Sequence, residues 1–168
     1  MANSSLSATA LTRHCLDRIT EVNPALRAVI AVSPDALGQA AESDAAWQAG
    51  RPRLLEGIPV LVKDNVQSEG LPATAGSSAL LAARPPDAFI IERLRAAGAV
   101  ILAKANLSEW ANFRSTRSTS GWSTLGGQTA NPYALDRNPS GSSSGSAAGL
   151  SAGFAPLAIG TKTDGSIV

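Results

Sequence analysis

The chain has 168 residues, with 14 Lys or Arg against 13 Asp or Glu and a formal net charge of +1. This length is typical of one domain, which would bury roughly 68 to 70% of its unfolded surface if it closed a complete core. The balanced charge gives no electrostatic reason to expect a nucleic acid or an anionic membrane as a partner. A single cysteine, Cys15, excludes an intrachain disulfide and a multi-cysteine metal site. We therefore expect no metal and no cofactor.

The first 20 residues carry charged side chains and lack a continuous apolar stretch, so they do not resemble a secretory signal. No uninterrupted apolar run reaches the roughly 18 residues that a membrane-spanning helix needs. We expect a cytoplasmic protein that does not bind a membrane.

A helix is predicted over residues 7–22, because apolar residues recur there at helical spacing. These residues are Leu11, Cys15, Ile19 and Val22. The pair Asn23-Pro24 is predicted to stop this helix. A short strand is expected over 27–32. A second helix should follow, with Ser33 as its cap, Pro34 at its first position and an end near Gly50.

The run 57–63 is short, apolar and bounded by turn residues, which favours a buried strand ending at Lys63. A loop-rich segment is expected over 66–86. Asp87 is predicted to cap a helix over 88–97, and Gly98 to end it.

A second apolar run over 99–104 is predicted to be another buried strand, ending at Lys104. Residues 107–113 favour a short helix, and 114–145 favour an irregular segment rich in small and polar residues. A small-residue helix is expected over 145–153 and a last strand over 156–160. Helices that alternate with strands indicate an α/β fold.

Few residues in this chain can act as a catalytic base, since there is one histidine and three lysines. His14 lies in the first predicted helix, where an exposed position is expected. Lysine is then the better base for a serine nucleophile, provided that its pKa is lowered by burial or by a nearby positive charge. Lys63 and Lys104 both end predicted strands, so the local pattern does not choose between them. A plain alternative for Lys63 is a solvated residue paired with Asp64.

The tract 139–149 is rich in serine and glycine, and three interpretations of it are open. It suits a flexible linker, a phosphate-binding turn at a helix N-terminus, or part of a hydrolytic site. The tract lies between a proline-bounded turn and an apolar helix, which argues against a linker. No Gly-Lys-Ser or Gly-Lys-Thr follows it, so the P-loop signal is absent.

Five ordered motifs resemble the amidase signature family. They lie at 57–65, 104–111, 126–132, 139–146 and 160–166. The resemblance implies the N-terminal part of that family's α/β fold, a mixed β-sheet flanked by helices. It covers the chain as a single partial amidase domain over 1–168, with a helical N-terminal region over about 5–50 and catalytic-core segments over about 55–168.

The family works with a serine, a second serine after a cis peptide bond, and a lysine. Laid on this chain, its pattern implies Lys63 as the base, Ser142 as the cis serine and Ser166 as the nucleophile. Lys104 then becomes structural. Backbone N–H groups around three further residues are expected to bind the oxyanion and the substrate: Thr163, Asp164 and Gly165.

Segments 110–114, 121–123 and 163–168 resemble the bacterial peptide amidase branch of the family, which removes ammonia from C-terminally amidated peptides. The implied activity is hydrolysis of a peptide C-terminal amide or a small acyl amide to an acid and ammonia. The implied partner is therefore a small amide or an amidated peptide. Two alternatives stay open: a non-catalytic remnant or interaction module, and the glutaminase subunit of a tRNA-dependent amidotransferase. That subunit usually ends the last motif in Gly-Gly-Ser-Ile-Arg, where this chain has Asp-Gly-Ser-Ile-Val.

Two departures from the family pattern affect the expectations. Lys162 stands where the family usually has an acidic residue, so it either depresses the pKa of Lys63 further or disrupts a network that expects a carboxylate. Family members also run to several hundred residues, which predicts an exposed strand edge and little ammonia release from the 168-residue chain alone. The oligomeric state is left open.

Overall fold

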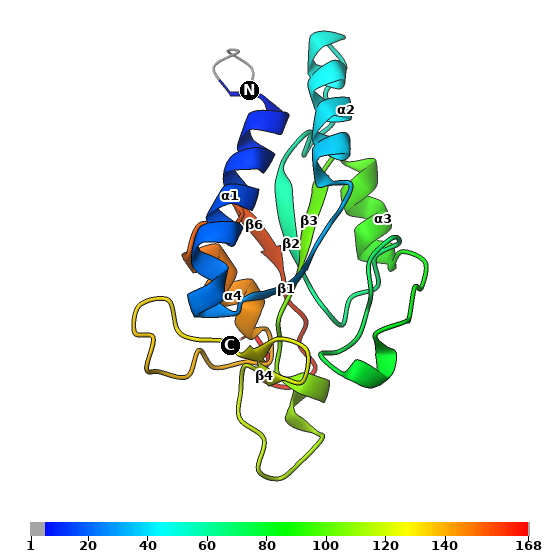
Figure 1. The fold of residues 1–168 in the computed structure, drawn as a ribbon. Coiled ribbons are helices and arrows are strands. Elements are labelled where there is room, and N and C mark those ends of the chain that lie inside the picture. The colour runs from blue at the N-terminus through cyan, green and yellow to red at the C-terminus, as the bar shows by residue number, and fades with distance from the viewer. Residues whose placement is uncertain (1–5, 168) are drawn as a thin grey trace.

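The computed structural model describes residues 6–167 and contains a four-stranded sheet with helices on both faces (Figure 1). Its strands are β1 (Val29–Val32), β2 (Pro59–Lys63), β3 (Val100–Ala105) and β6 (Leu157–Ile159). They lie in the order β1-β3-β2-β6. Strand β2 is parallel to β3 and β6, whereas β1 is antiparallel to β3. This mixed sheet confirms the predicted α/β class.

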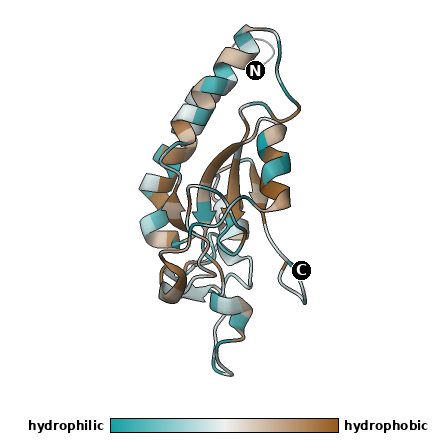
Figure 2. Cartoon of the chain, turned by 90° about the vertical axis from the view of Figure 1, so that its right-hand side faces the viewer, coloured by the Kyte–Doolittle hydropathy of each residue, from teal (hydrophilic) through white to brown (hydrophobic). Residues whose placement is uncertain are grey.

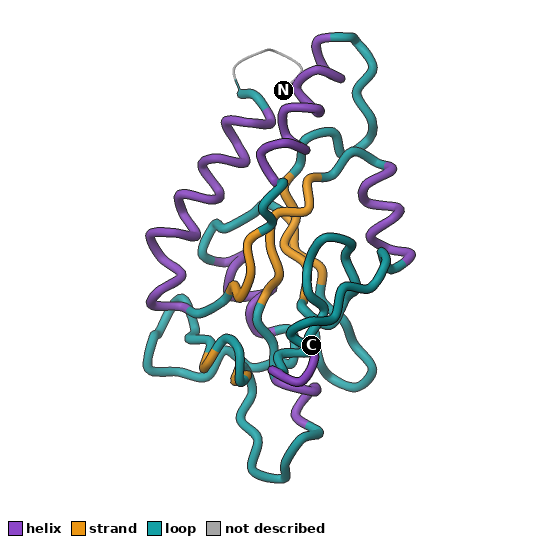
Figure 3. The backbone as a smooth tube through the Cα atoms, turned by 45° about the vertical axis from the view of Figure 1, so that its right-hand side comes forward, coloured by secondary structure: helices purple, strands orange, loops and turns teal. Residues whose placement is uncertain are grey.

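Within the described residues, four α-helices pack around the sheet (Figures 1 and 3). They are α1 (Ala8–Leu26), α2 (Ala36–Gln48), α3 (Phe89–Ala96) and α4 (Ser144–Ser151). One core joins α1, α2 and α4 to one face of the sheet, around Leu61, Leu102 and Phe154. A second core joins α3 to the other face, around Val62, Ile91 and Ile101. The two cores make three layers, with the sheet in the middle.

The two central strands are buried along their whole length. Because helices cover both of their faces, they are continuously apolar rather than alternating until the lysine near each C-terminal end, as Figure 2 shows by their colour. The predicted strands over 57–63 and 99–104 are thereby confirmed, with bounds shifted by one or two residues. Since β2, β3 and β6 are parallel, their C-terminal ends meet at one edge of the sheet. Lys63, Lys104 and the residues after Ile159 therefore lie at that edge.

Helix α1 passes the predicted stop at Asn23-Pro24 and ends at Leu26. Arg27 closes it in the left-handed region (φ 52°), and its backbone N–H donates to the Asn23 carbonyl at 2.7 Å. The Asn23 side chain also bonds both the N–H and the carbonyl of Val29, at 2.9 Å each. Asn23 therefore shapes the turn into β1 instead of ending the helix. A proline in the last turn lacks only one backbone donor, which the helix tolerates here.

Two predicted caps are wrong. Helix α2 begins at Ala36, and the N–H of Ser33 donates to the Leu102 carbonyl at 2.9 Å, so Ser33 still belongs to the sheet. Asp87 does not cap α3. Its carboxylate accepts from the Glu69 N–H at 2.6 Å and pairs with Arg95 at 2.8 Å, which ties the preceding loop to the helix.

The segment between β3 and α4 is mostly irregular, as predicted, but contains two short elements. The expected helix over 107–113 is a 3-10 turn, η2 (Glu109–Asn112). A small hairpin follows, formed by β4 (Trp122–Ser123) and β5 (Gly127–Gln128). The loop before α3 contains a further 3-10 turn, η1 (Ser78–Leu80). These loops lie beyond the C-terminal ends of the parallel strands.

Strand β6 is an edge strand within residues 6–167, since its only partner there is β2. Leu150 on α4 and Leu157 on β6 are both partly exposed beside this edge. The predicted open strand edge is therefore present in the described part of the chain. Across the same residues, no helix is long and apolar enough to cross a membrane.

Candidate active site

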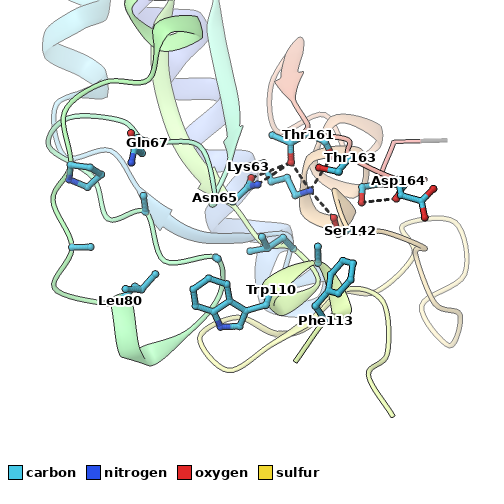
Figure 4. Close-up of a pocket in the computed structure, with 17 residues that line it drawn as sticks. Lys63, Asn65, Gln67, Leu80, Trp110, Phe113, Ser142, Thr161, Thr163 and Asp164 are labelled. Carbon is cyan, nitrogen blue, oxygen red and sulfur yellow. Dashed lines mark hydrogen bonds between the residues drawn. The ribbon is translucent and has the colours of Figure 1, made fainter. Parts of the chain in front are cut away.

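Lys63 ends β2, and its side chain is only 1% exposed. Its ammonium group has three acceptors: Ser142 Oγ at 2.8 Å, Thr161 Oγ1 at 2.9 Å and the Thr161 carbonyl at 3.3 Å (Figure 4). An ammonium carries three N–H donors, so these contacts match its full donor capacity. The sheet therefore holds Lys63 Nζ in one place, between the loop before α4 and the loop after β6.

Burial lowers the pKa of Lys63 to about 8. Desolvation disfavours the charged form, so an appreciable neutral fraction exists near pH 8. A neutral amine can accept a proton from the hydroxyl at 2.8 Å. The alternative of a solvated Lys63 paired with Asp64 is wrong, because the Asp64 carboxylate faces Thr74 and accepts from its N–H at 3.1 Å.

Ser142 is buried, and the Gly141-Ser142 peptide bond is cis. The Ser142 carbonyl accepts from the Ser108 N–H at 3.1 Å, which ties this loop to the end of β3. A Cβ on Gly141 would lie 2.5 Å from Ser108 Oγ and 2.6 Å from Ser144 Oγ. Only glycine fits this approach. The tract 139–149 is therefore an ordered, packed turn that leads into α4, and not a flexible linker.

Ser166 lies in the terminal loop after β6 and is half-buried. Its carbonyl accepts from the Ser143 N–H at 3.2 Å, which joins this loop to the Ser142 turn. Its hydroxyl contacts the Asp164 carbonyl at 3.4 Å, and no hydrogen bond among residues 6–167 links it to Ser142 Oγ. Lys63, Ser142 and Ser166 nevertheless line one cavity of about 810 Å³.

Thr163 and Asp164 line the same cavity, and Gly165 follows them at φ 68°. A left-handed residue here suits glycine and turns the chain sharply before Ser166. Within the described residues, no hydrogen bond occupies the backbone N–H groups of Thr163, Asp164 or Gly165. Val168, the end of this motif, lies outside the described residues.

Lys104 is fully buried on the neighbouring strand but does not line the cavity. Its ammonium donates to the Val66 carbonyl. Burial lowers the pKa of Lys104 to about 8, and the Asp64 charge opposes that shift. The same burial raises the pKa of Asp64. Lys104 therefore donates to a carbonyl and lies in the field of the Asp64 charge, with no hydroxyl among its hydrogen-bond partners in the described residues.

The two other candidate bases lie outside the cavity. His14 is exposed on α1, as expected. Lys162 is exposed in the loop after β6 and is absent from the cavity wall. Since the pKa of Lys63 is lowered by burial, no charge on Lys162 is needed to explain it.

Sequence reasoning missed the part played by Thr161 and Asn65. Thr161 Oγ1 accepts from Asn65 Nδ2 at 3.0 Å as well as from Lys63. The Thr161 N–H and carbonyl both bond Ser143 Oγ at 3.2 Å. Thr161 thus connects β2 to the Ser142 turn. Both residues lie inside motifs that carry the family resemblance, so position in those motifs was the available signal.

Within residues 6–167, no cluster of three or more His, Cys, Asp or Glu side chains could hold a metal ion. The polar groups at the cavity are instead hydroxyls, amides, one lysine and one exposed aspartate. This set suits proton transfer and hydrogen bonding.

Known proteins share this sequence and fold over part of their length. A probable amidase of Arabidopsis thaliana is 47% identical over 97% of this chain and 33% of its own length. One component of the glutamyl-tRNA(Gln) amidotransferase of Symbiobacterium thermophilum is 46% identical over 96% of this chain and 33% of its own. The chain therefore spans about a third of the length of these relatives.

Solved structures match as well. A peptide amidase in complex with the competitive inhibitor chymostatin has a TM-score of 0.98 and 53% identity, covering 100% of this chain and 35% of that one. The native peptide amidase of Stenotrophomonas maltophilia matches with the same TM-score and identity. The match corresponds to the N-terminal part of the known fold. A family model described as Amidase matches residues 10–168, and the chain accordingly belongs to the amidase signature family.

Proposed function

We propose that this chain carries the catalytic residues of an amidohydrolase, which converts a carboxamide to an acid and ammonia. The observation that carries the proposal is the 2.8 Å contact between Lys63 Nζ and Ser142 Oγ, at the wall of a cavity that Ser166 also lines. A lysine whose pKa is near 8 can act as a base at neutral to mildly alkaline pH. The family membership supports amide hydrolysis as the reaction class.

In this proposal, Ser166 Oγ attacks the carbonyl carbon of the amide. Its proton passes to Ser142 Oγ, whose own proton passes to neutral Lys63. The carbonyl oxygen becomes an oxyanion that accepts hydrogen bonds from the N–H groups of 163–165, a contribution of about 3 to 4 kcal/mol per donor. The C–N bond then breaks, and the proton held on Lys63 returns through Ser142 to the departing ammonia. Water hydrolyses the acyl-Ser166 ester by the same relay.

The two serine hydroxyls are not hydrogen bonded to each other within the described residues, so this relay requires a movement of Ser166. Ser166 Oγ contacts the Asp164 carbonyl in the structure, so it must rotate toward Ser142 for the transfer. Catalytic hydrogen bonds often tighten only when substrate is bound. The Ser143 N–H to Ser166 carbonyl bond keeps the two serine segments adjacent while that rotation occurs.

We propose a C-terminally amidated peptide or a small acyl amide as substrate. The structural relatives named as peptide amidases support this choice, and one of them binds the inhibitor chymostatin. The cavity of about 810 Å³ lies within the usual range for small-molecule sites. No part of the proposal requires a nucleic acid partner.

A glutaminase component of a tRNA-dependent amidotransferase is the second candidate, favoured by the 46% identity to the S. thermophilum protein. The terminal loop argues against it, because Asp164 stands where that component usually has glycine. The third candidate is a non-catalytic remnant. If this candidate is correct, the function of the chain does not depend on proton transfer among Ser166, Ser142 and Lys63.

The proposal is tested in a chimera, in which these 168 residues replace the matching third of the S. maltophilia peptide amidase. We expect ammonia release from an amidated dipeptide, and its loss in Ser166→Ala. Ser151→Ala, at an exposed serine on α4, is the matched control and should keep full activity. The 168-residue chain alone should release little ammonia. A folded chimera that is inactive would support the remnant, and activity that survives Ser166→Ala would contradict Ser166 as the nucleophile.

A further inference from the structure

The cavity has an apolar wall that the proposed reaction does not use. Trp110, Phe113 and Leu80 line the side opposite Lys63 and Ser142 (Figure 4). Trp110 is 45% exposed and Phe113 is 91% exposed, so both present large apolar surfaces to the opening. Contiguous exposed apolar surface in a cavity is typical of a ligand-binding site. We call these three residues the aromatic wall.

The backbone beneath the wall is held in an unusual conformation. Trp110, Ala111 and Asn112 have positive φ angles of 50°, 53° and 73°. The Trp110 N–H donates to the Ala75 carbonyl at 3.1 Å, and Asn112 Nδ2 donates to Ser120 Oγ at 3.0 Å. Three successive left-handed residues without glycine are costly, and such costs concentrate where a side chain must be aimed for function.

The charges beside the wall are already engaged. Arg114 pairs with Glu109 at 3.8 Å, and its guanidinium lies 4.2 Å from the centre of the Trp122 ring. Glu109 also accepts from the Thr124 N–H at 2.7 Å. Neither charge is therefore free to attract a charged ligand group. The wall offers aromatic and aliphatic surface alone.

The chemistry of the reaction decides which part of the substrate meets the wall. When a primary carboxamide is hydrolysed, the leaving group is ammonia, which carries no side chain. Any side-chain recognition must therefore act on the acyl part of the substrate. Within that part, the side chain nearest to the carbonyl carbon that Ser166 attacks is the one on the residue that carries the amide.

We propose that the aromatic wall binds an apolar, preferably aromatic, side chain on the residue that carries the amide. This inference rests on the proposed function for the placement of the carboxamide. An aromatic side chain stacked on Trp110 or Phe113 should tighten binding about fivefold to tenfold over a ligand without a side chain.

The test measures binding by the chimera carrying Ser166→Ala, so that no ligand is consumed. N-acetyl-phenylalaninamide and N-acetyl-glycinamide are titrated in turn and followed by NMR. We expect the phenylalanine ligand to bind about fivefold to tenfold more tightly. Phe113→Ala should remove most of this preference. Because Phe113 is almost fully exposed, this variant is expected to fold like the parent.

Tyr133→Ala is the matched control, since Tyr133 is also aromatic, is 85% exposed and does not line the cavity. It should leave the preference unchanged. Equal affinity for the two ligands, or a preference that survives Trp110→Ala together with Phe113→Ala, would overturn the inference.

Failure of the inference and failure of the proposed function are distinguishable in the chimera that keeps Ser166. Ammonia release from both ligands with equal kcat/KM would support the proposed amidohydrolase function and contradict the proposed role of the aromatic wall. The chimera could also prefer the phenylalanine ligand through Phe113 and yet release no ammonia from either ligand. This result would support the proposed role of the aromatic wall and contradict the proposed reaction.

Discussion

Two buried lysines end neighbouring strands of one sheet, and only one of them meets a hydroxyl in a cavity. Lys63 donates to Ser142 and Thr161, whereas Lys104 donates to the Val66 carbonyl. The negative charge of Asp64 also acts on Lys104 and opposes the lowering of its pKa that burial causes. Burial lowers the pKa of each to about 8. A lowered pKa therefore does not by itself mark a catalytic lysine. The partner atoms and access to the cavity distinguish the two lysines, and on them we base the different roles that we propose.

The largest expected effect follows from replacing Lys63 with arginine. Arginine keeps the positive charge but stays protonated, so it cannot act as the base. We expect kcat of the chimera to fall by about 10²- to 10⁴-fold, the usual contribution of a general base. Steady-state ammonia release measures it. An effect below tenfold would mean that Lys63 is not the base.

Replacing Lys104 with methionine should affect stability more than activity. The change leaves the Val66 carbonyl without its buried donor and removes a positive charge near Asp64, which should lower the free energy of unfolding by about 1 to 3 kcal/mol. Urea unfolding measures it. The chimera should keep kcat within about tenfold of the parent, because Lys104 does not line the cavity. The double variant with Asp64→Asn should recover part of the lost stability.

The stability of the chain should also depend on pH through these lysines. Each has a folded pKa near 8, below its ordinary value of 10.5. Between these pH values the unfolded chain binds more protons than the folded chain, so the free energy of unfolding rises with pH. Urea titrations between pH 7 and pH 10 should show this rise, and Lys104→Met should reduce its slope. A flat profile would contradict the burial of charged lysines.

The smallest expected effect concerns the third lysine. Lys162 is exposed and lies outside the cavity wall, where a single charge is worth about 0.2 to 1 kcal/mol. Lys162→Glu in the chimera should change kcat/KM less than about fivefold. A much larger increase would show that this lysine damages a network that needs a carboxylate.

Sequence patterns predicted which helices and strands form better than they predicted the residues that cap them. The apolar runs before Lys63 and Lys104 identified the two central strands, because burial on both faces requires continuous apolar sequence. The predicted caps of α2 and α3 were wrong, because the Ser33 N–H bonds a neighbouring strand and the Asp87 carboxylate bonds Glu69 and Arg95 instead of the first turn of α3. Such long-range contacts leave no local signal.

Local sequence did not choose between the two lysines, and only the family resemblance assigned Lys63 as the base. The structure adds a reason, since the Ser142 hydroxyl accepts from Lys63, whereas Lys104 donates to the Val66 carbonyl. Thr161 had no assigned role because its contact with Lys63 joins segments 98 residues apart. The unusual backbone at Trp110 was likewise invisible, since non-glycine residues rarely adopt positive φ.

The most direct test of the account is the pH dependence with which Ser166 reacts with a fluorophosphonate. In this reaction Ser166 Oγ bonds to phosphorus, fluoride leaves and the serine proton passes toward Lys63. Intact-mass spectrometry of the chimera measures the rate from pH 6 to pH 10. The account predicts a rate that rises through about pH 8, a rise that persists in Lys104→Met and disappears in Lys63→Arg. A rise that survives Lys63→Arg, or one lost in Lys104→Met alone, would contradict it.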